Sequence, residues 1–208
     1  MSAPGAPVPL ALDGSRIDGS LYGDVTDAAR HAPWALNDVI SFWSSFGLAF
    51  FALLTLLAWW RARGADAAVM ARVLAAPVVV GVVYAADMAL KSLVREPRPC
   101  RALPHSFTLE SCPAPGDWSF PSNHAVIAFS VATVLWFAHR RIGAVAALAA
   151  LAMAASRVWV GVHYPHDVVA GALVGVVLSV PLTLAASRGA GWVERARGGR
   201  LRPLLASA

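Results

Sequence analysis

Three polar clusters carry side chains that could bind and transfer a phosphoryl group. They read KSLVREPRP from Lys91 to Pro99, PSNH from Pro121 to His124, and SRVWVGVHYPHD from Ser156 to Asp167. Lys91, Arg98 and Arg157 supply three cations, which repel one another unless an anion joins them. Arginine forks match the paired oxygens of phosphate, and lysine adds a point charge. The clusters therefore predict a phosphate site, to which Ser122 and the first N–H groups of the following helix add donors.

Two histidines and an aspartate could supply the reacting groups. His124 and His163 can face the same phosphorus, one attacking in line while the other protonates the leaving oxygen. Asp167 follows His163 by four residues, one helical turn, and can accept the proton of the far ring nitrogen. Asp87 precedes Lys91 by the same interval, and we expect the two to form an ion pair.

At these positions the sequence resembles the type 2 phosphatidic acid phosphatase superfamily, which includes lipid phosphatases and vanadium haloperoxidases. The family pattern is Lys-x6-Arg-Pro, then Pro-Ser-Gly-His, then Ser-Arg-x5-His-x3-Asp. The first and third parts are intact here, whereas Asn123 replaces the glycine of the second, so the backbone freedom of glycine is lost at one phosphate contact. The resemblance extends over roughly residues 85–170.

The resemblance implies a role for each matching residue. His163 forms a phosphohistidine, Asp167 orients it, and His124 is the general acid. The phosphate is held by Lys91, Arg98, Ser122, Asn123 and Arg157. His166 also lies beside Asp167, but the family spacing selects His163. No metal or cofactor is implied, because the cations of the chain do the work that Mg²⁺ does elsewhere.

The composition indicates a membrane protein. Apolar residues make up 58% of the chain and charged residues only 14%, against roughly half and about a quarter in soluble domains. The net charge of +5 does not indicate nucleic-acid binding, because the basic residues are scattered between apolar runs.

The predicted fold is all-α, with about five transmembrane helices. These cover residues 39–60, 67–90, 122–138, 142–156 and 165–187. The first is long enough to cross a core of about 30 Å, whereas the third and fourth are short. Residues 21–37 mix apolar and charged side chains and are expected to form an amphipathic helix on the membrane surface, although residues 1–15 could equally be a flexible tail. The predicted organisation is an N-terminal tail and interfacial segment at 1–38, a phosphatase domain at 39–187 and a basic cytoplasmic tail at 188–208.

Arginine distribution predicts the orientation in the membrane. One side would hold ten basic residues against two acidic ones, and such a side is cytoplasmic. The N-terminus, the proline-rich 91–121 loop and all three polar clusters then lie outside. Cys100 and Cys112 lie in that loop, where they could form a disulfide or remain two free thiols.

Taken together, these features predict a multi-pass enzyme of the plasma (inner) membrane that hydrolyses a lipid phosphate or diphosphate on the extracytoplasmic side. The abundance of arginine, alanine and valine is associated with GC-rich bacteria. The first choice of substrate is therefore a polyprenyl diphosphate or polyprenyl-phosphate-linked carrier lipid of envelope assembly. Phosphatidic acid and phosphatidylglycerol phosphate are alternatives. A non-catalytic transporter or binder of anionic lipid is the rival class, whereas a haloperoxidase is disfavoured because those enzymes are soluble.

Overall fold

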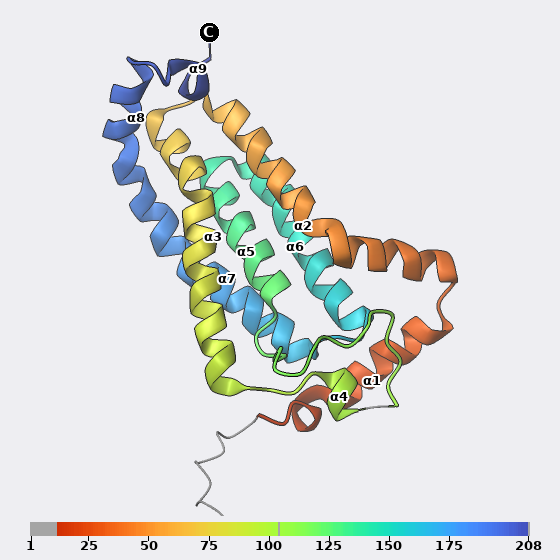
Figure 1. Cartoon of the computed structure of the whole chain (residues 1–208). Coiled ribbons are helices and arrows are strands. Elements are labelled where there is room, and N and C mark those ends of the chain that lie inside the picture. The colour runs from red at the N-terminus through yellow and green to blue at the C-terminus, as the bar shows by residue number, and fades with distance from the viewer. Residues whose placement is uncertain (1–11, 104, 208) are drawn as a thin grey trace, which may run out of the picture.

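The chain folds as a bundle of α-helices. The structure is a computed structural model that describes residues 12–103 and 105–207, and no β-strand occurs in this part of the chain (Figure 1). The elements are α1 (Ser15–His31), α2 (Trp34–Ala62), α3 (Ala67–Val94), α4 (Pro99–Ala102), α5 (Asn123–Ala138), α6 (Arg140–Trp159), α7 (Pro165–Ala186), the 3₁₀ turn η1 (Ser187–Gly189), α8 (Ala190–Arg197) and α9 (Arg202–Leu205). The all-α prediction is confirmed.

Four helices, α2, α3, α6 and α7, are long and apolar enough to cross a membrane. The fifth predicted span, α5, is apolar but has only 16 residues. It contacts α2, α3, α6 and α7 and is buried along most of its length. Because neighbouring helices cover α5, its length need not match the thickness of the lipid core. The protein is a multi-pass membrane protein.

Some helix boundaries differ from those predicted. The predicted surface helix at 21–37 is wrong in extent, because the chain breaks at Ala32 and Pro33 between α1 and α2. Ala32 is extended, with ψ 152°, since proline disfavours the helical conformation of the residue before it. α6 runs three residues beyond the predicted end because Ser156 and Arg157 are buried inside the bundle. The predicted tail falls mainly on residues 1–11, outside the described residues.

Helix α1 crosses the ends of α6 and α7 rather than running parallel to them (Figure 1). Its Tyr22 is fully buried and packs in a cluster with Val158, Tyr164 and Val168. The hydroxyl of Tyr22 donates to the carbonyl oxygen of Gly161 at 3.0 Å. α1 therefore braces the turn between α6 and α7.

Two glycines allow α7 to lie directly against α5. A Cβ atom at Gly171 would come within 2.7 Å of the Ser122 carbonyl oxygen, and one at Gly175 within 2.8 Å of the Val126 carbonyl oxygen. Small residues permit such close packing of membrane helices. The contact sets the start of α5 and the start of α7 side by side.

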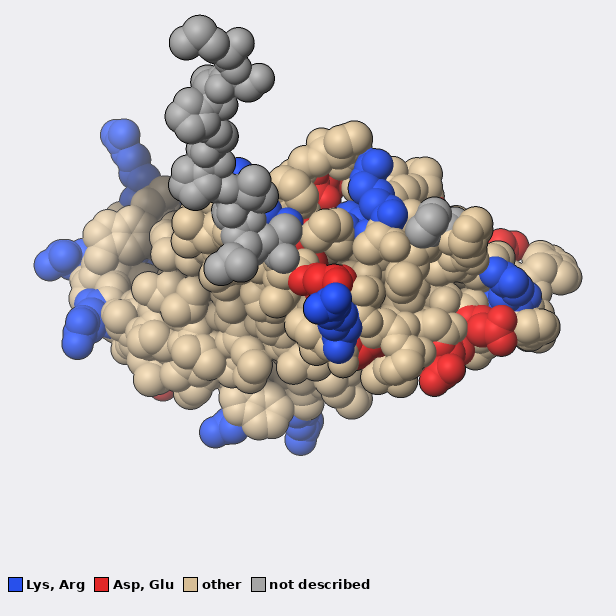
Figure 2. Space-filling model, turned by 90° about the horizontal axis from the view of Figure 1, so that it is seen from below, with Lys and Arg blue, Asp and Glu red and all other residues tan. Residues whose placement is uncertain are grey.

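The basic C-terminal segment folds onto the opposite end of the bundle, near the ends of α2 and α3 (Figure 1). Arg197 donates to the carbonyl oxygens of Ala62 and Ala65, at 3.2 and 2.8 Å. Figure 2 views the end that carries α1 and α4, where acidic and basic side chains are interspersed among uncharged ones.

Candidate active site

The turn between α6 and α7 positions His163. Gly161 adopts a positive φ of 83°, and a Cβ atom there would come within 2.8 Å of the Phe107 carbonyl oxygen, so glycine is required. Pro165 then begins α7, where its missing N–H costs nothing. The backbone N–H of Tyr164 donates to Asp167 Oδ2 at 2.8 Å and caps the helix.

Asp167 lies directly behind His163. Its Oδ2 atom is 3.2 Å from His163 Nδ1 and accepts a 2.5 Å hydrogen bond from Ser119 Oγ. Ser119 Oγ also lies 3.4 Å from His163 Nδ1. All three side chains are buried. Carboxylate, hydroxyl and imidazole thus form one network that fixes the plane of the imidazole ring.

Arg98 approaches the other nitrogen of the same ring. Its Nη1 atom lies 2.8 Å from His163 Nε2 and also donates to the Val162 carbonyl oxygen at 3.1 Å. A guanidinium can only donate, so Nε2 carries the lone pair and Nδ1 carries the proton that faces Asp167. The pKa of His163 is held well below its ordinary value, first by burial and then by the positive charges of Arg98 and Arg157. The imidazole is therefore neutral, with a lone pair available at Nε2.

Lys91 and Ser122 are buried close to the His163–Asp167 pair: Lys91 acts on His163 electrostatically, and the N–H of Ser122 donates to the Asp167 carbonyl oxygen at 3.1 Å. Lys91 Nζ donates to the carbonyl oxygens of Trp118 and Ser119 at 2.7 and 3.3 Å. The expected close ion pair with Asp87 is not present in the described part of the chain: Lys91 donates to the loop carbonyls, and both carboxylate oxygens of Asp87 are buried without a hydrogen bond. The two side chains still lie close enough to interact electrostatically. Ser122 Oγ is buried and has no partner among the described residues, so it is free to bind a ligand oxygen.

Arg157 and Asn123 already have protein partners. Arg157 Nη1 donates to Ser44 Oγ of α2. The same nitrogen donates to both carboxylate oxygens of Glu110, which each lie 3.2 Å from it. The side-chain amide of Asn123 points towards α3, where it lies 3.5 Å from the hydroxyl of Tyr84. A phosphate would therefore compete with Glu110 for Arg157.

His124, the expected general acid, lies in the first turn of α5 and is partly exposed. It is close enough to His163 to act on it electrostatically, together with Lys91, Arg98 and Arg157. In the loop above, Cys100 and Cys112 are joined by a disulfide, with their Cα atoms 5.9 Å apart.

Sequence reasoning missed several polar residues of this region. Ser119 stands three residues before Ser122, and its position beside the PSNH motif could have marked it. Asp117 and Glu110, which pair with Arg98 and Arg157, are lone acids in a proline-rich loop and give no sequence signal. Asp18 of α1 and Glu96, which lies within the first polar cluster, contact His166 and were not singled out either.

A buried, aspartate-backed histidine among cations, at one end of a helical membrane bundle, is the arrangement of a phosphate-transferring membrane enzyme. The family model described as "PAP2 superfamily" matches residues 72–188, more than half of the chain. The chain therefore belongs to the PAP2 superfamily, the type 2 phosphatidic acid phosphatases that its motifs resemble. It is a membrane lipid phosphatase, and the predicted enzyme class is confirmed.

Three curated relatives match parts of the chain. The bacitracin transport permease protein BcrC of Bacillus licheniformis is 34% identical over 142 residues, which are 68% of each chain. The undecaprenyl-diphosphatase of Sulfolobus acidocaldarius is 37% identical over 90 residues, 43% of each chain. The undecaprenyl-diphosphatase BcrC of Bacillus subtilis is 36% identical over 66 residues, 32% of this chain and 34% of that one.

Two crystal structures share the fold. LpxE of Aquifex aeolicus superposes with a TM-score of 0.62 at 25% identity, over 81% of this chain and 95% of that one. The transmembrane PAP2-type phosphatidylglycerolphosphate phosphatase of Bacillus subtilis gives a TM-score of 0.55 at 22% identity, over 82% and 86% of the two chains. The second likeness concerns the fold alone.

Proposed function

We propose that the protein hydrolyses undecaprenyl diphosphate, or a similar polyprenyl diphosphate, with His163 as the nucleophile. The observation that carries the mechanism is the position of His163 between Arg98 at Nε2 and Asp167 at Nδ1. Two relatives named undecaprenyl-diphosphatase support this substrate. A long apolar tail also suits a site at the end of membrane-spanning helices, where the tail can lie among helices while the diphosphate enters the cationic pocket.

In the first step, Nε2 of His163 attacks the terminal phosphorus, and the bond to the bridging oxygen breaks. His124 donates a proton to that oxygen, which leaves as polyprenyl monophosphate. Asp167 stabilises the positive charge that develops on His163. Lys91, Arg98 and the hydroxyl of Ser122 stabilise the negative charge on the phosphoryl oxygens.

In the second step, His124 has lost its proton and accepts one from a water molecule. The resulting nucleophile attacks the phosphohistidine, the P–N bond breaks, and inorganic phosphate leaves. Both histidines then regain their starting protonation states. Arg157 joins the phosphate by exchanging Glu110 for a phosphoryl oxygen, since both are anionic acceptors for the same guanidinium.

The site would face the extracytoplasmic side of the plasma membrane. The active-site end carries mixed charges (Figure 2), whereas the opposite end carries the arginines of the α2–α3 and α5–α6 connections and of the C-terminal segment. The positive-inside rule assigns that arginine-rich end to the cytoplasm.

The test is phosphate release by the purified full chain in detergent with EDTA present. Undecaprenyl diphosphate is compared with undecaprenyl monophosphate, phosphatidic acid and phosphatidylglycerol phosphate. His163→Ala is the inactive variant, and His31→Ala, which replaces an exposed histidine of α1, is its control. Preferred release from undecaprenyl diphosphate supports the proposal. One relative is named a transport permease, and folded protein that releases phosphate from none of these lipids would favour transport and contradict hydrolysis.

A further inference from the structure

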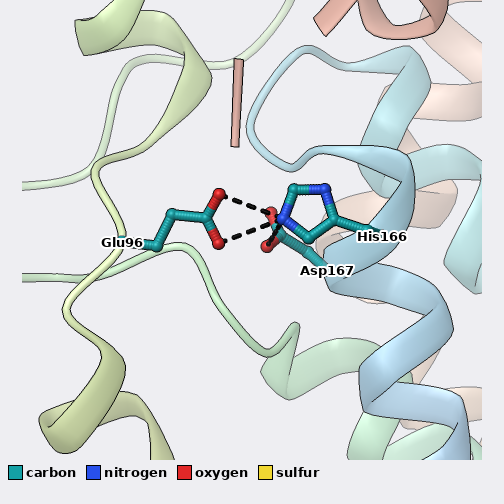
Figure 3. A group of neighbouring side chains, drawn as sticks. All are labelled: Glu96, His166 and Asp167. Atoms are coloured by element: carbon teal, nitrogen blue, oxygen red, sulfur yellow. Dashed lines mark hydrogen bonds and ion pairs between the residues drawn. The ribbon is translucent and has the colours of Figure 1, made fainter. Parts of the chain in front are cut away.

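A second polar cluster, centred on His166, lies beside the active site and shares only Asp167 with the proposed chemistry. Its Nε2 atom lies 3.0 and 3.1 Å from the two carboxylate oxygens of Glu96 and 3.6 Å from Asp167 Oδ1. Figure 3 shows Glu96 and Asp167 converging on this nitrogen. On the other side of the ring, Nδ1 lies 2.8 Å from Asp18 Oδ1. Three carboxylates therefore surround one imidazole.

Asp167 Oδ1 is buried and accepts no hydrogen bond from the described residues. Asp167 is fully buried, and its Oδ2 atom faces His163, Ser119 and the Tyr164 N–H. Oδ1 has no hydrogen-bond donor within the described ranges, 12–103 and 105–207. A buried carboxylate oxygen without a donor is unfavourable, and this one points to the space shared by Glu96 and His166 Nε2. One ligand atom from each of these residues lies within 4.8 Å of the other two.

The spacing of these donors suits a small tetrahedral cation. Zinc–nitrogen and zinc–oxygen bonds of about 2.0–2.1 Å place neighbouring donors about 3.3 Å apart. The separations from His166 Nε2, 3.0 and 3.6 Å, lie on either side of that value. A metal-binding histidine usually donates its other N–H to a carboxylate, and Asp18 occupies that position. His166 also stacks on Tyr164, with ring centroids 5.4 Å apart, which fixes the imidazole in place.

We propose that Glu96, His166 and Asp167 bind one divalent transition-metal ion of the Zn²⁺ type, and that Asp18 orients His166 for this role. Asp18, Glu96 and Asp167 bring three carboxylates to one imidazole, and a divalent cation would offset negative charge on them. The donor set of one nitrogen and two carboxylates leaves a fourth tetrahedral position for water. The ion would also connect the active-site loop to α7 and, through Asp18, to α1.

The ion would act on catalysis through the shared Asp167. A cation on Oδ1 withdraws negative charge from the carboxylate that stabilises His163, so occupancy lowers the rate of phosphate release. The site is therefore inhibitory: its ion takes no part in the chemical steps and affects them only through Asp167. This inhibition rests on the proposed function, whereas binding of the ion does not.

The binding test uses Co²⁺ as a spectroscopic probe on the full chain, purified in detergent and stripped with EDTA. We expect saturable binding of one Co²⁺ per chain, a visible absorption band of tetrahedral Co²⁺, and displacement by Zn²⁺. Glu96→Gln and His166→Gln should lose the band. His31→Gln should keep it, because His31 faces Asp27 at 3.6 Å on the exposed part of α1 and provides a matched imidazole–carboxylate pair. Asp18→Asn should weaken binding about 10–100-fold.

Absence of saturable Co²⁺ binding to the wild type would overturn the proposal. The contact between His166 and Glu96 would then be a hydrogen bond through a proton on the imidazole and not a shared metal ion. An unchanged band in folded His166→Gln and Glu96→Gln would overturn it as well. If those variants do not fold, Asp18→Asn decides, because undiminished affinity contradicts the role given to His166. A wild type that binds Co²⁺ but releases phosphate from no lipid would retain the metal site and remove the proposed function. Zn²⁺ inhibition that persists in Glu96→Gln would exclude this site as its cause.

Discussion

Arg98 Nη1 lies 2.8 Å from Nε2 of His163, and the opposite nitrogen of the same ring lies 3.2 Å from Asp167 Oδ2. A donor on one side and an acceptor on the other permit one neutral tautomer, with its lone pair at Nε2. The attacking atom thus faces the cation that would hold the phosphate. The contacts of His163 with Arg98 and Asp167 therefore orient the attacking nitrogen towards the place where the phosphate would bind.

Removing the nucleophile tests this assignment directly. His163→Ala should lower kcat by at least about 10³-fold, because the covalent route is lost. Wild-type protein quenched in alkali during turnover should carry acid-labile, base-stable phosphate on His163, and the variant should carry none. The same label on His124 or His166 would move the nucleophile to that residue. His105→Ala, at an exposed loop position, is the control.

Ser119 should act through Asp167. It donates a 2.5 Å hydrogen bond to the buried carboxylate, and hydrogen bonds to charged groups contribute about 1.5–3 kcal/mol. Ser119→Ala should therefore lower kcat about 10–100-fold with a smaller change in KM, and Ser119→Thr, which keeps the hydroxyl, should recover part of the loss. Ser111→Ala, at an exposed position of the same loop, should have no effect. A loss that appears only in KM would assign Ser119 to substrate binding.

The pH dependence should reflect the environment of His163. Protonation of Nε2 removes the attacking lone pair, so activity falls as the pH drops through the pKa of His163 in the folded enzyme. Burial, Arg98 and Arg157 lower this pKa, so the acid limb of kcat/KM should lie below the ordinary histidine value of about 6.5. Arg157→Gln removes one of these charges and should move the limb to higher pH, whereas Arg141→Gln, at the opposite end of the bundle, should not. If the acid limb of kcat/KM lay at the same pH in the two variants, the charge of Arg157 would not be a cause of the lowered pKa of His163.

Glu110 should compete with phosphate. Both of its carboxylate oxygens accept from Arg157 at 3.2 Å, so Glu110→Gln should free the guanidinium and lower the inhibition constant of vanadate several-fold. Asp117→Asn should not free Arg157, because the Asp117 carboxylate pairs with Arg98 instead. Weaker vanadate binding in Glu110→Gln would mean that Glu110 orients Arg157 for the ligand.

The orientation in the membrane can be tested with a cysteine-reactive, membrane-impermeant label. In a Cys100→Ser, Cys112→Ser background, Ser111→Cys should be labelled in intact cells, and Arg141→Cys only after lysis. Retained phosphate release in this background would show that the fold survives loss of the disulfide. The reverse labelling pattern would place the active site in the cytoplasm.

Local features of the molecule could be predicted from the sequence, since a membrane-spanning helix satisfies its own backbone. The apolar runs predicted the positions of α2, α3, α5 and α7, and most of the helix ends lie within a few residues of the predicted ones. The four-residue spacing also predicted the contact between His163 and Asp167, although His163 lies in the turn before α7 and not within the helix. Such patterns need no knowledge of the rest of the fold.

Contacts between distant segments could not be predicted. Arg157 and Glu110 are 47 residues apart, and His166 and Asp18 are 148 apart. Each pair depends on how the loop and α1 pack against the bundle, and a carboxylate in a loop has no periodicity. The break between α1 and α2 was missed although Pro33 was visible, because the apolar and charged pattern continues across it.

The disulfide between Cys100 and Cys112 has a practical consequence. It ties the ends of a short stretch of loop together, with Cα atoms 5.9 Å apart, and this stretch contains Glu110 but none of the residues assigned to the reaction. The stretch between the cysteines is therefore a natural cassette for protein engineering. Exchanging it among homologous enzymes would replace Glu110, the partner of Arg157, while the paired starts of α5 and α7 stay in place.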